Sequence, residues 1–252
     1  MNFPINFYLF GFEIESHFIF EVLAYTLGFK YYSYLRKKEK DLIADSDRLW
    51  IFIGAVFGGL IFSRLLSALE DFPTFINTST PLYYYYSNKT ILGGLLGGLL
   101  GVELTKKLIK VKTSSGDLMT FPLILGIIIG RIGCFLKGLE DGTFGTETNL
   151  PWAINFGDGI YRHPTNLYEI AFLILTWFFI KKLDKSYQLE NGSKFKVFMV
   201  LYLIYRFSSE FIKPVYKFSF GLSSIQIACI LGLIYYYKIL FSPKNLFIQL
   251  KN

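Results

Sequence analysis

The sequence is poor in the residues that build metal centres and disulfide bridges. It has two cysteines and two histidines, His17 and His163, among 252 residues. No run of cysteine and histidine has the spacing of a zinc site, so we expect no metal ion and no other cofactor. Cys134 and Cys229 fall in apolar runs, where we expect packing residues rather than a disulfide. A reactive thiol at Cys134, close to Arg131, is the alternative.

Further absences narrow the class of protein. The glycine-rich stretch 93–101 lacks the lysine of a phosphate-binding loop, so we expect close helix packing there rather than nucleotide binding. Residues 1–18 lack the basic start of a secretory signal, so we expect none to be cleaved. The net charge is +7, but the lysines lie in short loops between apolar runs. We therefore expect no nucleic-acid partner.

Apolar residues are what the chain has in abundance. Hydrophobic residues make up 52% of the sequence and aromatic residues 19%. Several apolar runs approach the ~20 residues that a helix needs to cross a bilayer. We predict an all-α, polytopic membrane protein that forms a single membrane-embedded domain over residues 1–252. Seven transmembrane helices are expected at about 18–35, 48–69, 91–111, 119–138, 166–182, 195–213 and 222–241.

Basic residues in the short loops predict which way the chain faces. Lysine and arginine concentrate in loops that stay in the cytoplasm. Five of them lie between residues 36 and 48, whereas Lys89 is the one basic residue between 70 and 90. The alternation continues along most of the chain. It predicts an N-terminus outside the membrane and a C-terminus in the cytoplasm.

Charged residues interrupt the outer halves of several predicted helices. Arg131 and Arg206 are expected at similar depth, where a buried arginine is costly. Two guanidinium groups repel each other unless an anion lies between them, and a phosphate matches their geometry. Snorkelling of Arg131 and a purely structural Arg206–Glu210 pair are the alternatives. The other polar residues expected in this leaflet are Lys137, His163, Gln226, Glu21 and His17.

His163 lies in the outer loop that precedes the fifth predicted helix. Its ring can bond a backbone carbonyl, or it can accept a proton near a reacting group, because the ordinary pKa of histidine lies near neutrality. The sequence leaves both readings open.

Four motifs in order resemble those of the bacterial prolipoprotein diacylglyceryl transferase family. The first is GRIGCFLKG at 130–138, which is followed by Gly145, and the second is RHPTNLYE at 162–169. The third is RFSSEFIKP at 206–214, and the fourth is Gln226 within SSIQIA. The glycine-rich stretch 93–101 is also similar to the third helix of the family.

The resemblance implies both an activity and a location. Members of this family transfer the diacylglyceryl group of phosphatidylglycerol to the lipobox cysteine thiol of a prolipoprotein. The reaction forms a thioether and releases glycerol 1-phosphate. The resemblance implies seven membrane helices with the N-terminus outside, in the bacterial cytoplasmic membrane, with the active site toward the outer leaflet. The implied partners are phosphatidylglycerol, a lipobox peptide and membrane lipids.

The resemblance also implies roles for particular residues. Arg131 is expected to hold the lipid phosphate, and Arg206 is the second functional arginine. We expect Glu210 to hold Arg206 in position, and His163 or Glu21 to take the thiol proton. The remaining expected substrate-binding residues are Lys137, Gly145 and Gln226.

The chain departs from the family pattern at several positions. Leu92 stands where the family has a histidine, and Cys134 and Lys137 each stand where it has an asparagine. Two alternatives to the transferase therefore stay open. One is a non-catalytic binder or carrier of anionic phospholipid, and the other is a membrane transferase with a different acceptor.

Overall fold

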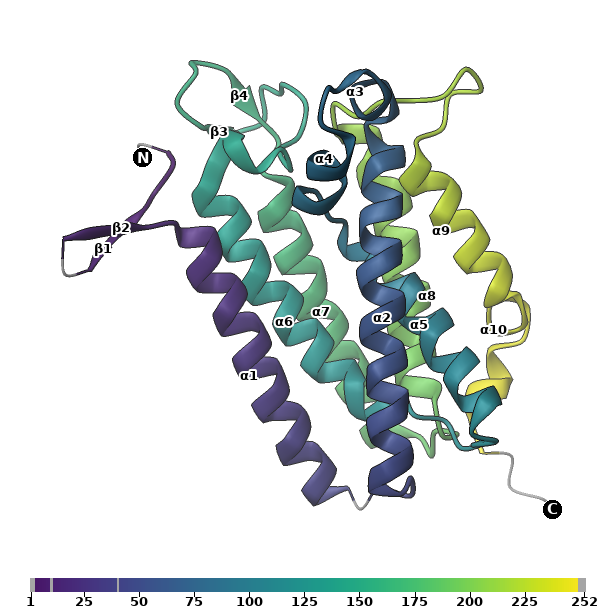
Figure 1. Cartoon of the computed structure of the whole chain (residues 1–252). Helices are drawn as coiled ribbons and strands as arrows, with labels where there is room; N and C mark the ends of the chain where they lie inside the picture. Colours follow the sequence, from purple (N-terminus) through teal and green to yellow (C-terminus); the bar gives the residue numbers. More distant parts are fainter. Residues whose placement is uncertain (1–2, 10, 40, 249–252) are drawn as a thin grey trace.

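The computed structural model describes residues 3–9, 11–39 and 41–248, which form a bundle of helices with two small β-hairpins near one end (Figure 1). The α-helices of the described residues are α1 (Ser16–Lys38), α2 (Asp45–Glu70), α3 (Phe72–Asn77), α4 (Pro81–Ser87), α5 (Ile91–Leu108), α6 (Asp117–Lys137), α7 (Thr165–Ser186), α8 (Ser193–Ser209), α9 (Ser224–Tyr235) and α10 (Tyr237–Phe241). Short 3₁₀ helices follow at η1 (Gly138–Asp141), η2 (Glu210–Ile212) and η3 (Pro243–Leu246).

The small strands belong to the hairpins. Strand β1 (Phe7–Leu9) pairs antiparallel with β2 (Phe12–Ile14), directly before α1. Strand β3 (Ile154–Asn155) pairs antiparallel with β4 (Tyr161–Arg162), in the connection between α6 and α7. The all-helical expectation missed both pairs, because strands of two or three residues carry no readable alternation.

Within the described residues, two helices are long and apolar enough to cross a membrane. They cover Asp45–Glu70 and Asp117–Asp141, the second being α6 continued by η1, and each contains an 18-residue stretch with a mean hydropathy of 2.0. Helix α9 is apolar but shorter. Together with the predominance of helix, this agrees with a helical membrane protein.

Glycine lets α2 and α5 pack backbone against backbone. A side-chain carbon added at Gly97 would overlap the carbonyl oxygen of Gly58 and the side chain of Phe62. One added at Gly101 would overlap the carbonyl oxygen of Gly54. Such close approach needs small residues on both helices. The glycine-rich stretch therefore joins these two helices, as its spacing predicts for a packing role.

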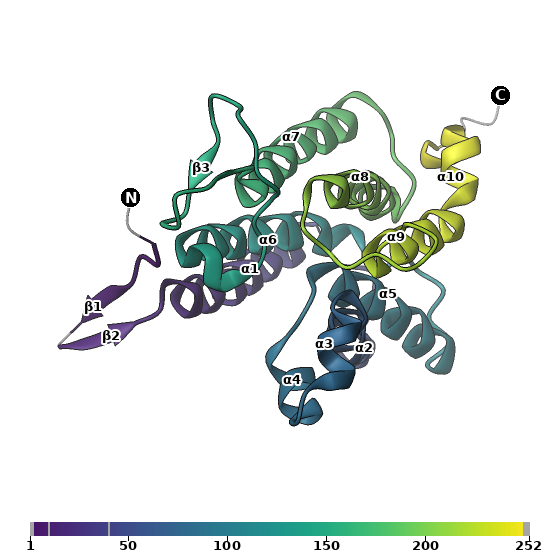
Figure 2. The ribbon, with the colours of Figure 1, turned by 90° about the horizontal axis from the view of Figure 1, so that it is seen from above.

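The site-bearing helices lie on the other side of the bundle. Helix α1 runs along α6 in both views, and α8 lies between α7 and α9 (Figures 1 and 2). The core between them is apolar: Ile124, Leu173, Phe198 and Leu203 are fully buried. These helices bring charged residues from distant parts of the chain to one place.

Two predicted helices end differently in the structure. The range 195–213 is helical through Ser209 and continues as η2 to Ile212. Lys213 is extended (φ −114°, ψ 144°) because the residue before Pro214 is driven out of helical geometry. The range 222–241 was expected as one helix. It is broken at Tyr236 (φ −93°, ψ 14°), between α9 and α10.

Candidate functional site

Arg131 and Arg206 meet at a single carboxylate inside the bundle. Glu169 Oε2 lies 2.9 Å from Arg131 Nη2 and 3.7 Å from Arg206 Nη1. The three side chains come from α6, α7 and α8 and are 5%, 2% and 4% exposed, respectively, for Arg131, Glu169 and Arg206. The anion that the two arginines share in this structure is thus a carboxylate of the chain itself.

The sequence reasoning did not select Glu169 as a site residue. It lies in the second turn of α7, which begins directly after Pro164. The hydroxyl of Tyr202 donates a 2.8 Å hydrogen bond to its Oε1, so both carboxylate oxygens are held. A signal was present: Glu169 ends the motif RHPTNLYE and opens an apolar run, and an ionisable residue inside a membrane helix is a candidate functional group by default.

A second carboxylate, Glu210, holds the far side of Arg206. Arg206 Nη2 donates a 3.0 Å hydrogen bond to Glu210 Oε1, as the i, i+4 spacing suggests. Glu210 Oε2 accepts a 3.1 Å hydrogen bond from Ser223 Oγ, and Lys213 Nζ lies 4.0 Å from Oε1. Glu210 is fully buried. Three cationic side chains and two carboxylates are therefore in ion-pair contact, and the Glu70 carboxylate at the end of α2 interacts electrostatically with Lys213 and both arginines.

Several guanidinium nitrogens of the cluster are buried without a hydrogen-bond acceptor. Among the described residues, Arg131 Nε and Arg206 Nε and Nη1 have none. A buried donor left unpaired costs about 1–3 kcal/mol, and more for a charged group. Because these guanidinium donors remain free, the cluster can bind an added anion.

Gln226 is tied to the start of α9. Its backbone N–H donates to Ser223 Oγ at 3.1 Å, and its side-chain oxygen accepts from the Ser223 backbone N–H at 3.0 Å. The two bonds form a reciprocal capping box. In this structure Gln226 reaches the cluster indirectly, since the Ser223 hydroxyl bonds Glu210.

Glu21 and Lys137, both expected at the site, form ion pairs of their own. Glu21 pairs with Lys89, and its Oε2 lies 3.8 Å from His17 Nδ1. Lys137 Nζ lies 3.2 Å from Glu15 Oε2, on the segment that enters α1. These pairs lie at the ends of α1 and α6, and the structure does not bring their side chains into ion-pair contact with either cluster arginine within the described residues.

His163 and Gly145 pack against each other in the connection between α6 and α7. The Gly145 backbone N–H donates a 3.0 Å hydrogen bond to the His163 carbonyl, and a side-chain carbon at Gly145 would lie 2.5 Å from His163 Cβ. The His163 ring lies 3.2 Å from the Tyr168 hydroxyl, through Nδ1. A hydrogen bond from this ring to a backbone carbonyl was one of the two expectations, and the partner in the structure is a tyrosine hydroxyl instead.

An ion pair braces the same loop. Asp158 Oδ2 lies 2.6 Å from Arg162 Nη2. The hydrogen bond from Arg162 holds the pKa of the Asp158 carboxyl below its ordinary value of 3.8. The Arg162 guanidinium also lies 5.2 Å from the ring centre of Phe144.

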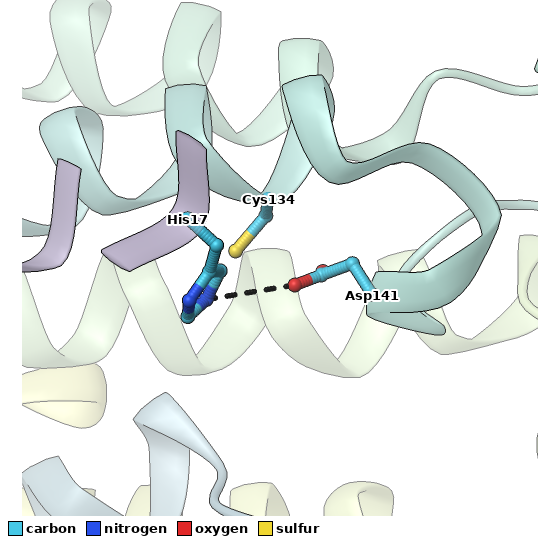
Figure 3. A group of neighbouring side chains, drawn as sticks. All are labelled: His17, Cys134 and Asp141. Carbon is cyan, nitrogen blue, oxygen red and sulfur yellow. Dashed lines mark ion pairs between the residues drawn. The ribbon is translucent and has the colours of Figure 1, made fainter. Parts of the chain in front are cut away.

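His17, Cys134 and Asp141 come together in the structure (Figure 3), although no ligand cluster was expected from their spacing. Their candidate ligand atoms all lie within 4.8 Å of one another, and His17 Nε2 is 3.6 Å from Asp141 Oδ1. Cys134 Sγ lies 3.9 Å from Arg131 Nη1. The group has one residue from each of α1, α6 and η1, which sequence spacing cannot relate.

The sequence matches proteins of one family along nearly its whole length. The family model described as prolipoprotein diacylglyceryl transferase matches residues 4–241. A protein of Campylobacter hominis is 29% identical over 250 residues, which cover 92% of this chain and 87% of the relative. One of Campylobacter curvus is 29% identical over 244 residues, covering 90% and 89%. One of Wolbachia pipientis is 29% identical over 214 residues, covering 79% of each chain. All three relatives are named phosphatidylglycerol–prolipoprotein diacylglyceryl transferase.

Proposed function

Because this chain belongs to the prolipoprotein diacylglyceryl transferase family, we propose that it transfers the diacylglyceryl group of phosphatidylglycerol to the lipobox cysteine thiol of a prolipoprotein. The products are a thioether on the prolipoprotein and glycerol 1-phosphate. The observation that supports a location for the active site is the buried pair of arginines, Arg131 and Arg206, which both contact Glu169.

The two arginines hold the phosphate of the lipid. The reaction breaks a carbon–oxygen bond, and the leaving phosphate carries its negative charge away. Fixed donors in a site without water stabilise such charge, and losing one comparable donor costs about 2.7–4 kcal/mol of barrier. The unpaired Nε groups of Arg131 and Arg206 are the donors that a phosphate oxygen would meet.

Glu169 keeps the two guanidinium groups together before the lipid arrives. Without a carboxylate between them, two buried cations would repel each other and separate. Glu210 positions Arg206 from the opposite side, through the 3.0 Å hydrogen bond. The phosphate therefore binds to donors already set in place, which reduces the reorganisation needed during the reaction.

The site faces the outer leaflet of the bacterial cytoplasmic membrane in this proposal. Seven helices cross the bilayer, with the N-terminus outside and the C-terminus in the cytoplasm. The support is the distribution of basic residues, since Arg36, Lys37 and Lys38 end α1 and Lys106 and Lys107 lie in the last turn of α5. Both helix ends lie at the end of the bundle away from the two hairpins (Figure 1).

The remaining expected residues take supporting roles in the proposal. Gly145 and Gln226 shape the substrate site by packing the loop and starting α9, and Lys137 adds positive charge near the headgroup. His163 or Glu21 is the proton acceptor expected from the sequence. Each has a competing partner in the structure, the Tyr168 hydroxyl for His163 and Lys89 for Glu21.

The test uses the full chain in phosphatidylglycerol vesicles with a lipobox peptide. We expect release of glycerol phosphate together with thioether formation, and we expect Arg131→Ala to abolish both. Arg64→Gln is the matched control, because Arg64 also lies on a membrane helix but bonds the Leu60 carbonyl. Lipid binding without release would favour the carrier, and full transfer by Arg131→Ala would refute the phosphate assignment.

A further inference from the structure

His17 lies between two carboxylates at the start of α1. Its Nε2 is 3.6 Å from Asp141 Oδ1 (Figure 3), and its Nδ1 is 3.8 Å from Glu21 Oε2. The side chain is 26% exposed, so a substrate can reach it. An imidazole held between two carboxylates is well placed to act as a general base, because contacts on both ring nitrogens fix its orientation.

The ring is one side chain away from the proposed phosphate site. Cys134 Sγ lies within 4.8 Å of the ligand atoms of His17 and Asp141 and 3.9 Å from Arg131 Nη1. Gly133 makes this closeness possible, because a side-chain carbon there would lie 3.3 Å from His17 Cα and 2.8 Å from Phe20 Cβ. A proton acceptor and a phosphate-binding arginine are thus adjacent, as a thiol attacking a phosphate-bearing carbon requires.

We propose that His17 is the catalytic residue that takes the proton from the lipobox thiol, and that Asp141 and Glu21 are positioning residues for its ring. This inference rests on the proposed transferase function. The thiol S–H bond breaks and its proton passes to an imidazole nitrogen of His17. The sulfur forms a bond to the carbon of the diacylglyceryl group that is bonded to the phosphate oxygen. The carbon–oxygen bond breaks, its electron pair leaves with glycerol phosphate, and the imidazolium returns its proton to water.

The surroundings of His17 favour this residue over the other candidates. Asp141 is itself held by the hydroxyl of Thr143, which fixes its position toward the ring. Glu21 is paired with Lys89, so its carboxylate is already compensated by a cation. The charged groups that face the ring are Asp141 from η1 and Glu21 from its own helix, with Arg131 of α6 beyond the Cys134 thiol.

A divalent cation bound by the same three side chains would use them differently. Such an ion would sit beside the permanent charge of Arg131, whose Nη1 is 3.9 Å from Cys134 Sγ, and that repulsion disfavours it. We therefore assign these residues to proton transfer.

The experiment measures transfer by the full chain, in the vesicle and peptide assay above, from about pH 5 to pH 8, where histidine changes charge. We expect His17→Gln to lower kcat by about 10²–10⁴-fold, the usual contribution of a general base. The fall in transfer rate toward low pH should disappear in this variant. Its binding of phosphatidylglycerol should stay at the wild-type level. Added imidazole should restore part of the rate of His17→Ala, which keeps the test valid if the glutamine disturbs packing.

The substitution Asp141→Asn tests whether Asp141 positions the His17 ring or only contributes to the stability of the fold. Loss of this carboxylate should lower kcat less than His17→Gln does and leave phosphatidylglycerol binding unchanged, because the imidazole is still present but loses the 3.6 Å contact that orients it. Glu13→Gln is the matched control: Glu13 is an exposed carboxylate bonded by Asn6 at 2.8 Å, and its removal should leave kcat unchanged.

Several results would overturn the inference. One is a wild-type rate and pH profile in His17→Gln, and another is loss of the fall in rate toward low pH in His163→Gln instead. Inactivation of the wild type by a chelator with recovery on adding zinc, or a diacylglyceryl adduct on Cys134, would replace the proposed step. Absence of any transfer by the wild-type chain refutes the proposed function itself. Transfer by the wild type and equally by His17→Gln refutes only the role of His17.

Discussion

The substitution Glu169→Gln tests whether one carboxylate holds the two arginines together. Glutamine has nearly the same shape and can still accept the 2.8 Å hydrogen bond from Tyr202, so the change removes mainly the negative charge. The charge lost lies 2.9 Å from Arg131 Nη2 and 3.7 Å from Arg206 Nη1. The variant therefore leaves two buried guanidinium groups without their common partner.

The magnitude follows from the burial of the three side chains. Unit charges about 4 Å apart attract by about 4 kcal/mol at an effective dielectric constant of ~20. Removing one partner of a buried ion pair typically costs about 3–5 kcal/mol, because the other charge is left uncompensated. Glu169 serves two such partners, so we expect the free energy of unfolding to fall by at least about 3 kcal/mol. We also expect transfer to be lost with it.

Denaturant titration of the protein in lipid nanodiscs measures the effect. Glu103→Gln is the control, because the Glu103 carboxylate, which pairs with Lys106 at 3.3 Å, is 47% exposed, and an ion pair with a solvent-exposed carboxylate contributes about 1 kcal/mol or less. Adding Arg131→Gln to Glu169→Gln should cost less than Arg131→Gln alone, since the partner is already gone. Equal stability and equal transfer in Glu169→Gln and the wild type would refute this account of the cluster.

Three further predictions concern the supports of the site. Gly97→Ala should destabilise the protein by about 1–3 kcal/mol in thermal or denaturant unfolding, because the added methyl group overlaps α2. The control Gly98→Ala should be close to neutral, because its methyl group would lie 3.5 Å from the Ala55 carbonyl oxygen. Similar effects at both positions would contradict the packing argument. Ser223→Ala should lower the free energy of unfolding by about 0.5–2 kcal/mol through loss of the α9 cap, and should lower the transfer rate because Glu210 loses a hydrogen bond. The control Ser208→Ala, at an exposed serine of α8, should do neither. An unchanged transfer rate in Ser223→Ala would show that the cap does not support the site. Burial opposes ionisation of Asp41, but hydrogen bonds from Arg48 and Arg36 outweigh it and lower the pKa of this loop carboxyl below 3.8. The stability that the ionised carboxyl gives the folded protein is therefore fully present above pH 3.8, and it is lost as the pH falls through the lower pKa of the folded state. Asp41→Asn should therefore cost about 1.5–3 kcal/mol near neutral pH and progressively less in acid, and a deficit independent of pH would refute the assignment.

The sequence was sufficient for the family and for the helical class. The four motifs, read in order, predict a member of the prolipoprotein diacylglyceryl transferase family, and the match over residues 4–241 confirms it. Apolar runs predict a mostly helical membrane protein. They do not predict the break at Tyr236, because apolar residues continue on both sides of it.

The composition of the site depended on three-dimensional proximity. Arg131 and Arg206 could be expected to share an anion because both are costly in a membrane, but their partner Glu169 lies on a third helix and no sequence spacing relates it to either arginine. The grouping of His17 with Asp141 arises from the packing of α1 on α6 at Gly133. In contrast, the Arg206–Glu210 contact is local, and its i, i+4 spacing alone predicted it.

The most direct test of the central claim is solid-state NMR of the full chain, with ¹⁵N-labelled arginine, in phosphatidylglycerol bilayers. If Arg131 and Arg206 hold the same phosphate, the lipid ³¹P nucleus should show dipolar coupling to guanidinium nitrogens of both residues, and Arg131→Lys and Arg206→Lys should each remove the signal assigned to that arginine. Coupling to neither arginine, with the phosphate instead beside Lys137 or at the bilayer surface, would contradict the account.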